Sequence, residues 1–185
     1  MAPQNTMLSE VVGKLSKKAC CTLRVIRLWK VPRPNEPNIA RSVDTVLQDT
    51  DGMCIHASID RTQLIEKFLD AIVQHEIYLM IFFNVIPNTI GWRPTSHAFK
   101  FYFNDTTTVS ENVAMDYPDF PMDLYHFKTI DQILETPSSN EAPDLINFIG
   151  VLVPTETVYP SESAGSNKLT FHLLDSGNQR TNVTL

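Results

Sequence analysis

Long apolar runs are missing from this 185-residue sequence, and glycine is scarce. The longest apolar run, residues 77–83, has the length of a strand, whereas a membrane-spanning helix needs about 20 apolar residues. The lysines near the N-terminus follow a weakly apolar stretch, which is the reverse of a secretory signal peptide. We therefore expect an intracellular protein that does not associate with membranes.

Motifs for catalysis and cofactor binding are also lacking. The six glycines form no phosphate-binding or dinucleotide loop, and there is no GxSxG, HExxH or Walker motif. The three cysteines form no CxxC pair and have no histidine at zinc-ligand spacing, and the five histidines are scattered. The sequence predicts that the protein is not an enzyme and holds neither a metal nor a cofactor.

Basic charge is in short supply, because the formal net charge is -6. The distribution is uneven: residues 19–110 carry nine basic and nine acidic side chains, whereas residues 111–185 carry three basic against eleven acidic ones. A neutral domain still binds a single strand when its cations line one groove and its aromatic side chains stack on the bases. The charge pattern is therefore compatible with nucleic-acid binding but does not predict it.

Strand patterns dominate the first 110 residues. Alternating apolar and polar residues predict strands over 22–31, 42–48, 53–59, 76–85 and 98–104, the last extended by 106–109. The sequence Asp49-Thr50-Asp51-Gly52 predicts a turn between the second and third strands. Three prolines within residues 32–38 predict a loop, because proline donates no hydrogen bond to a sheet.

One helix is expected among these strands. Apolar residues at spacings of three and four predict a helix over 63–73, with Asp60 or Thr62 as its cap. Three strands, a helix and two further strands form the order of an all-β, five-stranded Greek-key barrel with the helix between strands 3 and 4. This order excludes a doubly wound α/β fold.

The chain is predicted to have four parts. Residues 1–18 form an N-terminal extension, 19–110 the barrel, and 111–143 an acidic, proline-containing linker with a short helix over 124–134. Residues 144–185 begin a second unit, with a buried strand over 145–153 and a hairpin formed by 168–175 and 181–185. Because a sheet that ended there would expose an unpaired edge, we expect an incomplete domain.

Aromatic residues near the barrel strands are the candidate binding groups. Trp92, next to Arg93, is expected either to stack on a base at the mouth of the groove or to cover the end of the barrel. Trp29 is expected in the core, as are the phenylalanines that share one strand face, Phe99, Phe101 and Phe103.

Five segments together resemble a known family. They are TLRVIRLWKVPRPNEPN, SVDTVLQDTDGMCIHASI, LIEKF, YLMIFFNVIPN and GWRPTSHAFKFYFN. In this order and spacing they resemble the first DNA-binding OB domain of plant replication protein A large-subunit-like proteins. The later segments DLINFIGVLV and KLTFHLLDSGNQRTNVTL resemble the opening strands of that family's second OB domain. The resemblance implies an OB-fold barrel followed by an incomplete second OB domain.

The resemblance also implies the binding residues. Trp92 stands where the family places a base-stacking aromatic, and the family's other stacking position, near residues 59–61, has no aromatic here. Six cations become candidates for phosphate contact: Arg27, Lys30, Arg41, Arg61, Arg93 and Lys100.

The implied function is non-catalytic binding of single-stranded DNA in replication, repair and recombination in the nucleus, without a cofactor. Other replication protein A subunits or repair proteins are the implied protein partners. RNA remains an alternative ligand, because stacking and phosphate contact scarcely distinguish it from DNA. Two alternatives lack DNA binding: an OB-fold protein-interaction module, and a decayed copy of the family.

Overall fold

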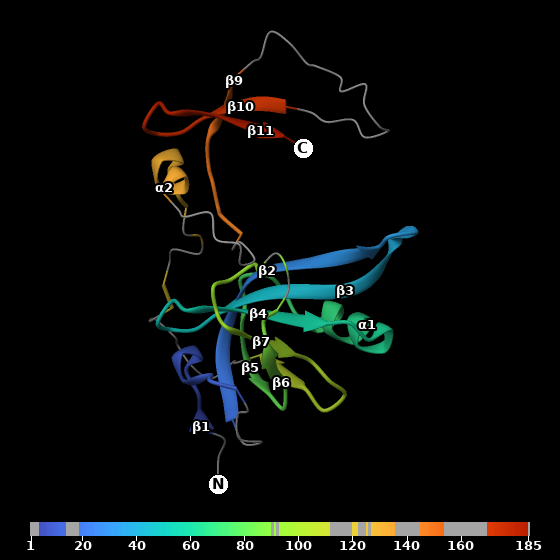
Figure 1. Ribbon diagram of the computed structural model, residues 1–185. Coiled ribbons are helices and arrows are strands. Elements are labelled where there is room, and N and C mark those ends of the chain that lie inside the picture. Colours follow the sequence, from blue (N-terminus) through green and yellow to red (C-terminus); the bar gives the residue numbers. More distant parts are fainter. Residues whose placement is uncertain are drawn as a thin grey trace. The chain divides into compact units, whose positions relative to one another are not determined.

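The computed structural model describes residues 4–13, 19–89, 91, 93–111, 120–121, 125, 127–135, 145–153 and 170–184 (Figure 1). The chain separates into two compact units. Unit 1 comprises Met1–Leu124 with Glu141–Leu145, and unit 2 comprises Tyr125–Asn140 with Ile146–Leu185. In the described part, no helix is long and apolar enough to cross a membrane.

Unit 1 is built on one large sheet. Its strands follow the order β6-β7-β4-β3-β2-β5-β8, and β1 pairs with β2 off this path. Their bounds are Gln4–Asn5 (β1), Ala19–Arg33 (β2), Glu36–Gln48 (β3), Cys54–Ile59 (β4), Ile77–Ile81 (β5), Asn84–Pro87 (β6), Phe99–Tyr102 (β7) and Thr108–Glu111 (β8). A short 3-10 helix, η1 (Leu8–Glu10), precedes β2.

Short connections in the chain join the two ends of the sheet, β6 with β7 at one end and β5 with β8 at the other. β5 leads into β6 across only Phe82 and Phe83, and β7 leads into β8 across residues 103–107. Phe82 has a positive φ of 61°, and its carbonyl oxygen accepts hydrogen bonds from the side chains of Asn104 and Thr107. The sheet therefore curls back on itself. The strand predicted over 76–85 is in fact broken at this bend.

The core lies inside the curl and is covered by α1 (Thr62–Ala71). Leu64, Ile65 and Phe68 of α1 are buried, and the ring of Phe68 meets that of Phe103 edge-on at 5.1 Å. The predicted helix is confirmed, but its predicted cap is wrong. Arg61 is the N-cap residue, and no side chain caps the helix.

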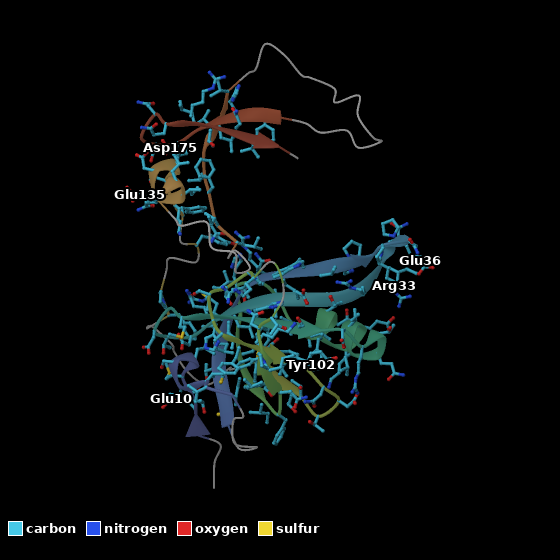
Figure 2. All side chains as sticks on the ribbon, viewed as in Figure 1. Glu10, Arg33, Glu36, Tyr102, Glu135 and Asp175 are labelled. Atoms are coloured by element: carbon cyan, nitrogen blue, oxygen red, sulfur yellow. The ribbon has the colours of Figure 1, made fainter. Side chains whose placement is uncertain are left out.

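The predicted loop over 32–38 is largely strand. β2 and β3 form a long hairpin arm whose turn comprises only Pro34 and Asn35, and the arm reaches beyond the shorter strands of unit 1 (Figure 1). Register shifts on either side of Pro32 fit a proline into the ladder, as β-bulges commonly do. Arg33 and Glu36 form an exposed ion pair at the tip, 3.5 Å apart (Figure 2).

Unit 2 has a three-stranded sheet and a short helix. The sheet order is β11-β10-β9, formed by Val151–Val153 (β9), Thr170–Leu174 (β10) and Arg180–Thr184 (β11). The predicted hairpin is confirmed. α2 (Ile130–Leu134) is capped by Thr129, whose hydroxyl accepts a hydrogen bond from the backbone of Gln132.

The strand predicted over 145–153 is shorter and more exposed than expected. β9 covers only its last three residues, and apolar side chains along the stretch keep much of their surface exposed, among them Ile149 (66%), Val151 (68%) and Leu152 (62%). The prediction of a buried strand is therefore wrong for these residues. An apolar run alone does not say which partner covers it.

An aspartate closes the β3–β4 turn in unit 1. One oxygen of the buried Asp49 accepts hydrogen bonds from the backbone of Asp51 and Met53, at 3.1 and 3.0 Å. The other oxygen accepts one from the backbone of Leu8, the first residue of η1, at 2.9 Å. Asp49 thus links the turn to the N-terminal segment.

The β10–β11 turn of unit 2 repeats this arrangement. One oxygen of Asp175 accepts hydrogen bonds from the backbone of Gly177 and Gln179, each at 2.9 Å. The other accepts one at 3.0 Å from Ile130, the first residue of α2, and Asp175 lies beside this helix (Figure 2). Each unit therefore contains the same module: a short helix, three strands in the same order, and an aspartate that joins the helix to the turn.

Candidate functional site

Two neighbouring rows of side chains cross the outer face of the unit 1 sheet, the face turned away from the core. The register aligns the first row as Arg27, Val46, His56, Lys100 and Ile86. It aligns the second as Trp29, Asp44, Ser58, Tyr102 and Asn84. We call seven of these residues the polar strip: Arg27, Trp29, Asp44, His56, Ser58, Lys100 and Tyr102.

A bulge in β2 brings Trp29 onto the strip. Leu23 and Val25 point into the core, and the register shifts between Val25 and Arg27. Beyond the shift, Arg27 and Trp29 lie opposite Val46 and Asp44 of the outer face. The prediction that Trp29 belongs to the core is therefore wrong, because an extra residue in one strand reverses the alternation. Trp29 is half-buried.

Trp29 lies over a buried histidine. The rings of Trp29 and His56 are nearly parallel, at 10°, with their centroids 6.2 Å apart. His56 is only 1% exposed; its Nε2 lies 3.6 Å from Oδ2 of Asp44 and 3.3 Å from the hydroxyl of Ser58. These contacts fix the imidazole, and the imidazole supports one face of the indole.

The pKa of Asp44 is lowered. Burial on its own raises it, but the hydrogen bond and electrostatic interaction with His56, together with Ser58 and Lys100, outweigh burial. Asp44 is therefore ionised at neutral pH. It is a carboxylate in the middle of the strip, and 18% of its side chain is exposed.

This lowered pKa predicts a pH dependence of folding. A carboxyl whose pKa is lower in the folded than in the unfolded state stabilises the fold above its unfolded pKa, and that contribution is lost as the pH falls through its folded pKa. The free energies of unfolding of the wild type and Asp44→Asn, measured in urea, should differ most at pH values above 3.8 and converge below it. If the difference in free energy of unfolding does not change with pH, the ionisation of Asp44 is not its cause.

The far end of the strip is held by two further contacts. Nζ of Lys100 donates a hydrogen bond to the hydroxyl of Ser58 at 3.3 Å. The hydroxyl of Tyr102 donates one to Asp60, which raises the pKa of Tyr102. The strip therefore combines two aromatic side chains and two cations around one carboxylate.

The predicted phosphate contacts divide into groups. Arg27 and Lys100 lie on the strip, whereas Lys30 pairs with Val43 on the opposite face and Arg41 is exposed on β3. Arg61 forms an ion pair with Asp105 at the start of α1.

Of the two predicted residues that follow β6, the structure describes only Arg93. Arg93 is half-buried, and its carbonyl oxygen accepts a hydrogen bond from the backbone of Leu145 at 2.8 Å. Trp92 lies outside the described residues. The roles of all seven predicted site residues stay predictions.

Four members of the strip were missed from the sequence: Asp44, His56, Ser58 and Tyr102. A signal existed, because each alternates with core residues such as Val43, Ala57 and Phe101. No histidine motif marks His56 in the sequence, because Ser58 is a neighbour on β4 but Asp44 and Trp29 come from β3 and β2.

The described residues offer little other chemistry. They contain no group of three or more histidine, cysteine or acidic side chains that could hold a metal ion. Burial, as the largest cause, raises the pKa of Cys21 to about 12 and that of Cys54 to about 11. Both thiols are therefore protonated at neutral pH and are poor nucleophiles.

Comparisons with known proteins agree with this architecture. A family model described as "Domain of unknown function DUF223" matches residues 15–136. No curated protein matches the chain. A chain of a solved replication protein A heterotrimer bound to ssDNA is similar over 92% of the present chain, with 20% identity and a TM-score of 0.53. The match covers 40% of that longer chain. At this identity the likeness shows the fold, which is OB-like and mostly β.

Proposed function

Because the chain belongs to the DUF223 family and has an OB-like fold, we propose that unit 1 binds single-stranded DNA through the polar strip. The observation that carries the proposal is the placement of Trp29 and Tyr102 in one row, with Arg27 and Lys100 in the row beside it. Non-specific single-strand binders use this combination, because aromatic rings stack on bases while cations neutralise phosphates.

The contact between Trp29 and His56 also favours base stacking on the strip. An indole that already rests on the fixed imidazole of His56 loses little further freedom when a base stacks on it. We further propose that Trp92 stacks on a second base, and that Lys30, Arg41, Arg61 and Arg93 contact phosphates along the continuing strand.

We also propose a finer domain assignment. Unit 1 is a complete five-stranded OB barrel in which β5 with β6, and β7 with β8, act as bent fourth and fifth strands. Unit 2 is the opening half of a second OB domain, since it repeats the helix, strand order and aspartate turn of unit 1.

From the sequence resemblance, we propose a non-catalytic protein of the plant replication protein A large-subunit type. It acts in the nucleus in replication, repair and recombination, and other replication protein A subunits or repair proteins are its partners.

Fluorescence anisotropy of a labelled oligothymidylate of about 30 nucleotides tests the function. Trp29→Ala is expected to weaken binding by about 1–3 kcal/mol, and Trp92→Ala by a similar amount, because each loses a stacked base. Phe82→Ala, which removes an exposed aromatic away from the strip, is the control and should bind like the wild type.

Salt titrations test the cations. Replacing Arg27 or Lys100 by alanine should lower the slope of log affinity against log salt by about 0.7 each, whereas Lys67→Ala on α1 should leave it unchanged. An oligouridylate measured in parallel decides between DNA and RNA. If the folded protein does not bind at low salt, the single-strand proposal fails. The acidic excess of residues 111–185 would then favour the protein-interaction module.

A further inference from the structure

Asp44 is out of place on a surface that only binds phosphates. The register puts it directly opposite Trp29 in one row, with Ser58 on its other side. Asp44 contacts the buried His56, but a negative charge on this outer face also repels the phosphate backbone. Its position therefore fits a ligand group that donates hydrogen bonds.

The contacts of Asp44 prepare it to accept such bonds. His56 lies on one side, with Nε2 at 3.6 Å from Oδ2, and part of the carboxylate remains exposed beside the indole. An ionised carboxylate has no hydrogen to donate and accepts through both oxygens. Directly opposite residues of an antiparallel pair lie about 4.5–5.5 Å apart at Cβ, so the edge of a base stacked on Trp29 comes within reach.

Building on the proposed function, we infer that Asp44 accepts hydrogen bonds from a guanine stacked on Trp29, so that the strip prefers guanine at this position. Guanine presents two adjacent donors on its Watson–Crick edge, the N1 imino and N2 amino groups. Adenine and cytosine present one amino group next to an acceptor, and thymine presents one imino group between two carbonyl oxygens. Only guanine therefore matches both oxygens of a carboxylate without placing an acceptor against it.

The test compares three labelled oligonucleotides of about 10 nucleotides: oligothymidylate, alternating thymidine–deoxyguanosine, and alternating thymidine–deoxyinosine. Inosine lacks only the N2 amino group. Lithium salts and isolated guanines prevent quadruplex formation. The wild-type chain should bind the guanine oligonucleotide about tenfold more tightly than oligothymidylate, with the inosine oligonucleotide in between.

Asp44→Asn should abolish this preference, because an amide has one acceptor oxygen where the carboxylate has two. Asp70→Asn, which makes the same charge change on the exposed face of α1, should keep the preference. If the wild type binds all three oligonucleotides equally, the inference is overturned while the proposed function stands. If it binds none, the proposed function itself fails. The inosine comparison uses wild-type protein and so remains decisive if Asp44→Asn folds poorly.

Discussion

Phe101→Ala is expected to lower the free energy of unfolding of unit 1 by about 3–5 kcal/mol. Phe101 is fully buried on β7, and its ring is stacked against that of Phe83 with centroids 4.0 Å apart. Phe83 lies at the bend between β5 and β6, so the cavity would open where the sheet curls. Close packing there leaves few neighbours able to move inward.

Urea unfolding followed by tryptophan fluorescence measures this loss, because both tryptophans belong to unit 1. Phe82→Ala is the matched control: the same atoms are removed one residue away from Phe83, but the side chain is 49% exposed. Its effect should stay below about 1 kcal/mol. Equal losses in the two variants would show that Phe101 does not hold the curl.

Asp49→Ala is expected to destabilise unit 1 by about 3 kcal/mol. The substitution removes the acceptor for three backbone N–H groups, those of Leu8, Asp51 and Met53. The N–H group of Leu8 is buried and would lose its bond to a charged partner, which is costly. Asp49→Asn keeps one carbonyl acceptor and should cost roughly half as much.

Thermal and urea unfolding measure this effect as well. Asp51→Ala, in the same turn but exposed, is the control and should cost less than about 1 kcal/mol. Proteolysis adds a second readout, because η1 should become cleavable in Asp49→Ala at temperatures where the sheet is still folded. A variant that unfolds like Asp51→Ala would mean that the link to the N-terminal segment contributes no stability.

The sequence predicted the fold class and most elements because local patterns encode them. Period-two alternation marked β3 and β4, and helical spacing marked α1. The errors share one cause, which is geometry that local patterns do not encode. The bulge beyond Val25 reversed the face of Trp29, and the bend at Phe82 divided a strand.

The candidate site was less predictable than the fold. Their charge makes Arg27 and Lys100 candidates in the sequence, and both lie on the polar strip. Asp44 and His56 have no motif, because they become neighbours only when β3 pairs with β4. Their contacts run between strands, and the sequence of a single strand does not predict which residue of another strand it will pair with.

The hairpin arm of β2 and β3 offers a way to follow how far a bound strand extends. Its tip is exposed, so its amide hydrogens exchange with solvent through small local openings, whereas those of Leu23 and Val25 exchange only when the whole sheet opens. A ligand confined to the polar strip would leave exchange at the tip unchanged. A bound strand that continues along the arm would slow hydrogen exchange at the tip. Exchange at the tip therefore reports how far along the arm the bound strand extends.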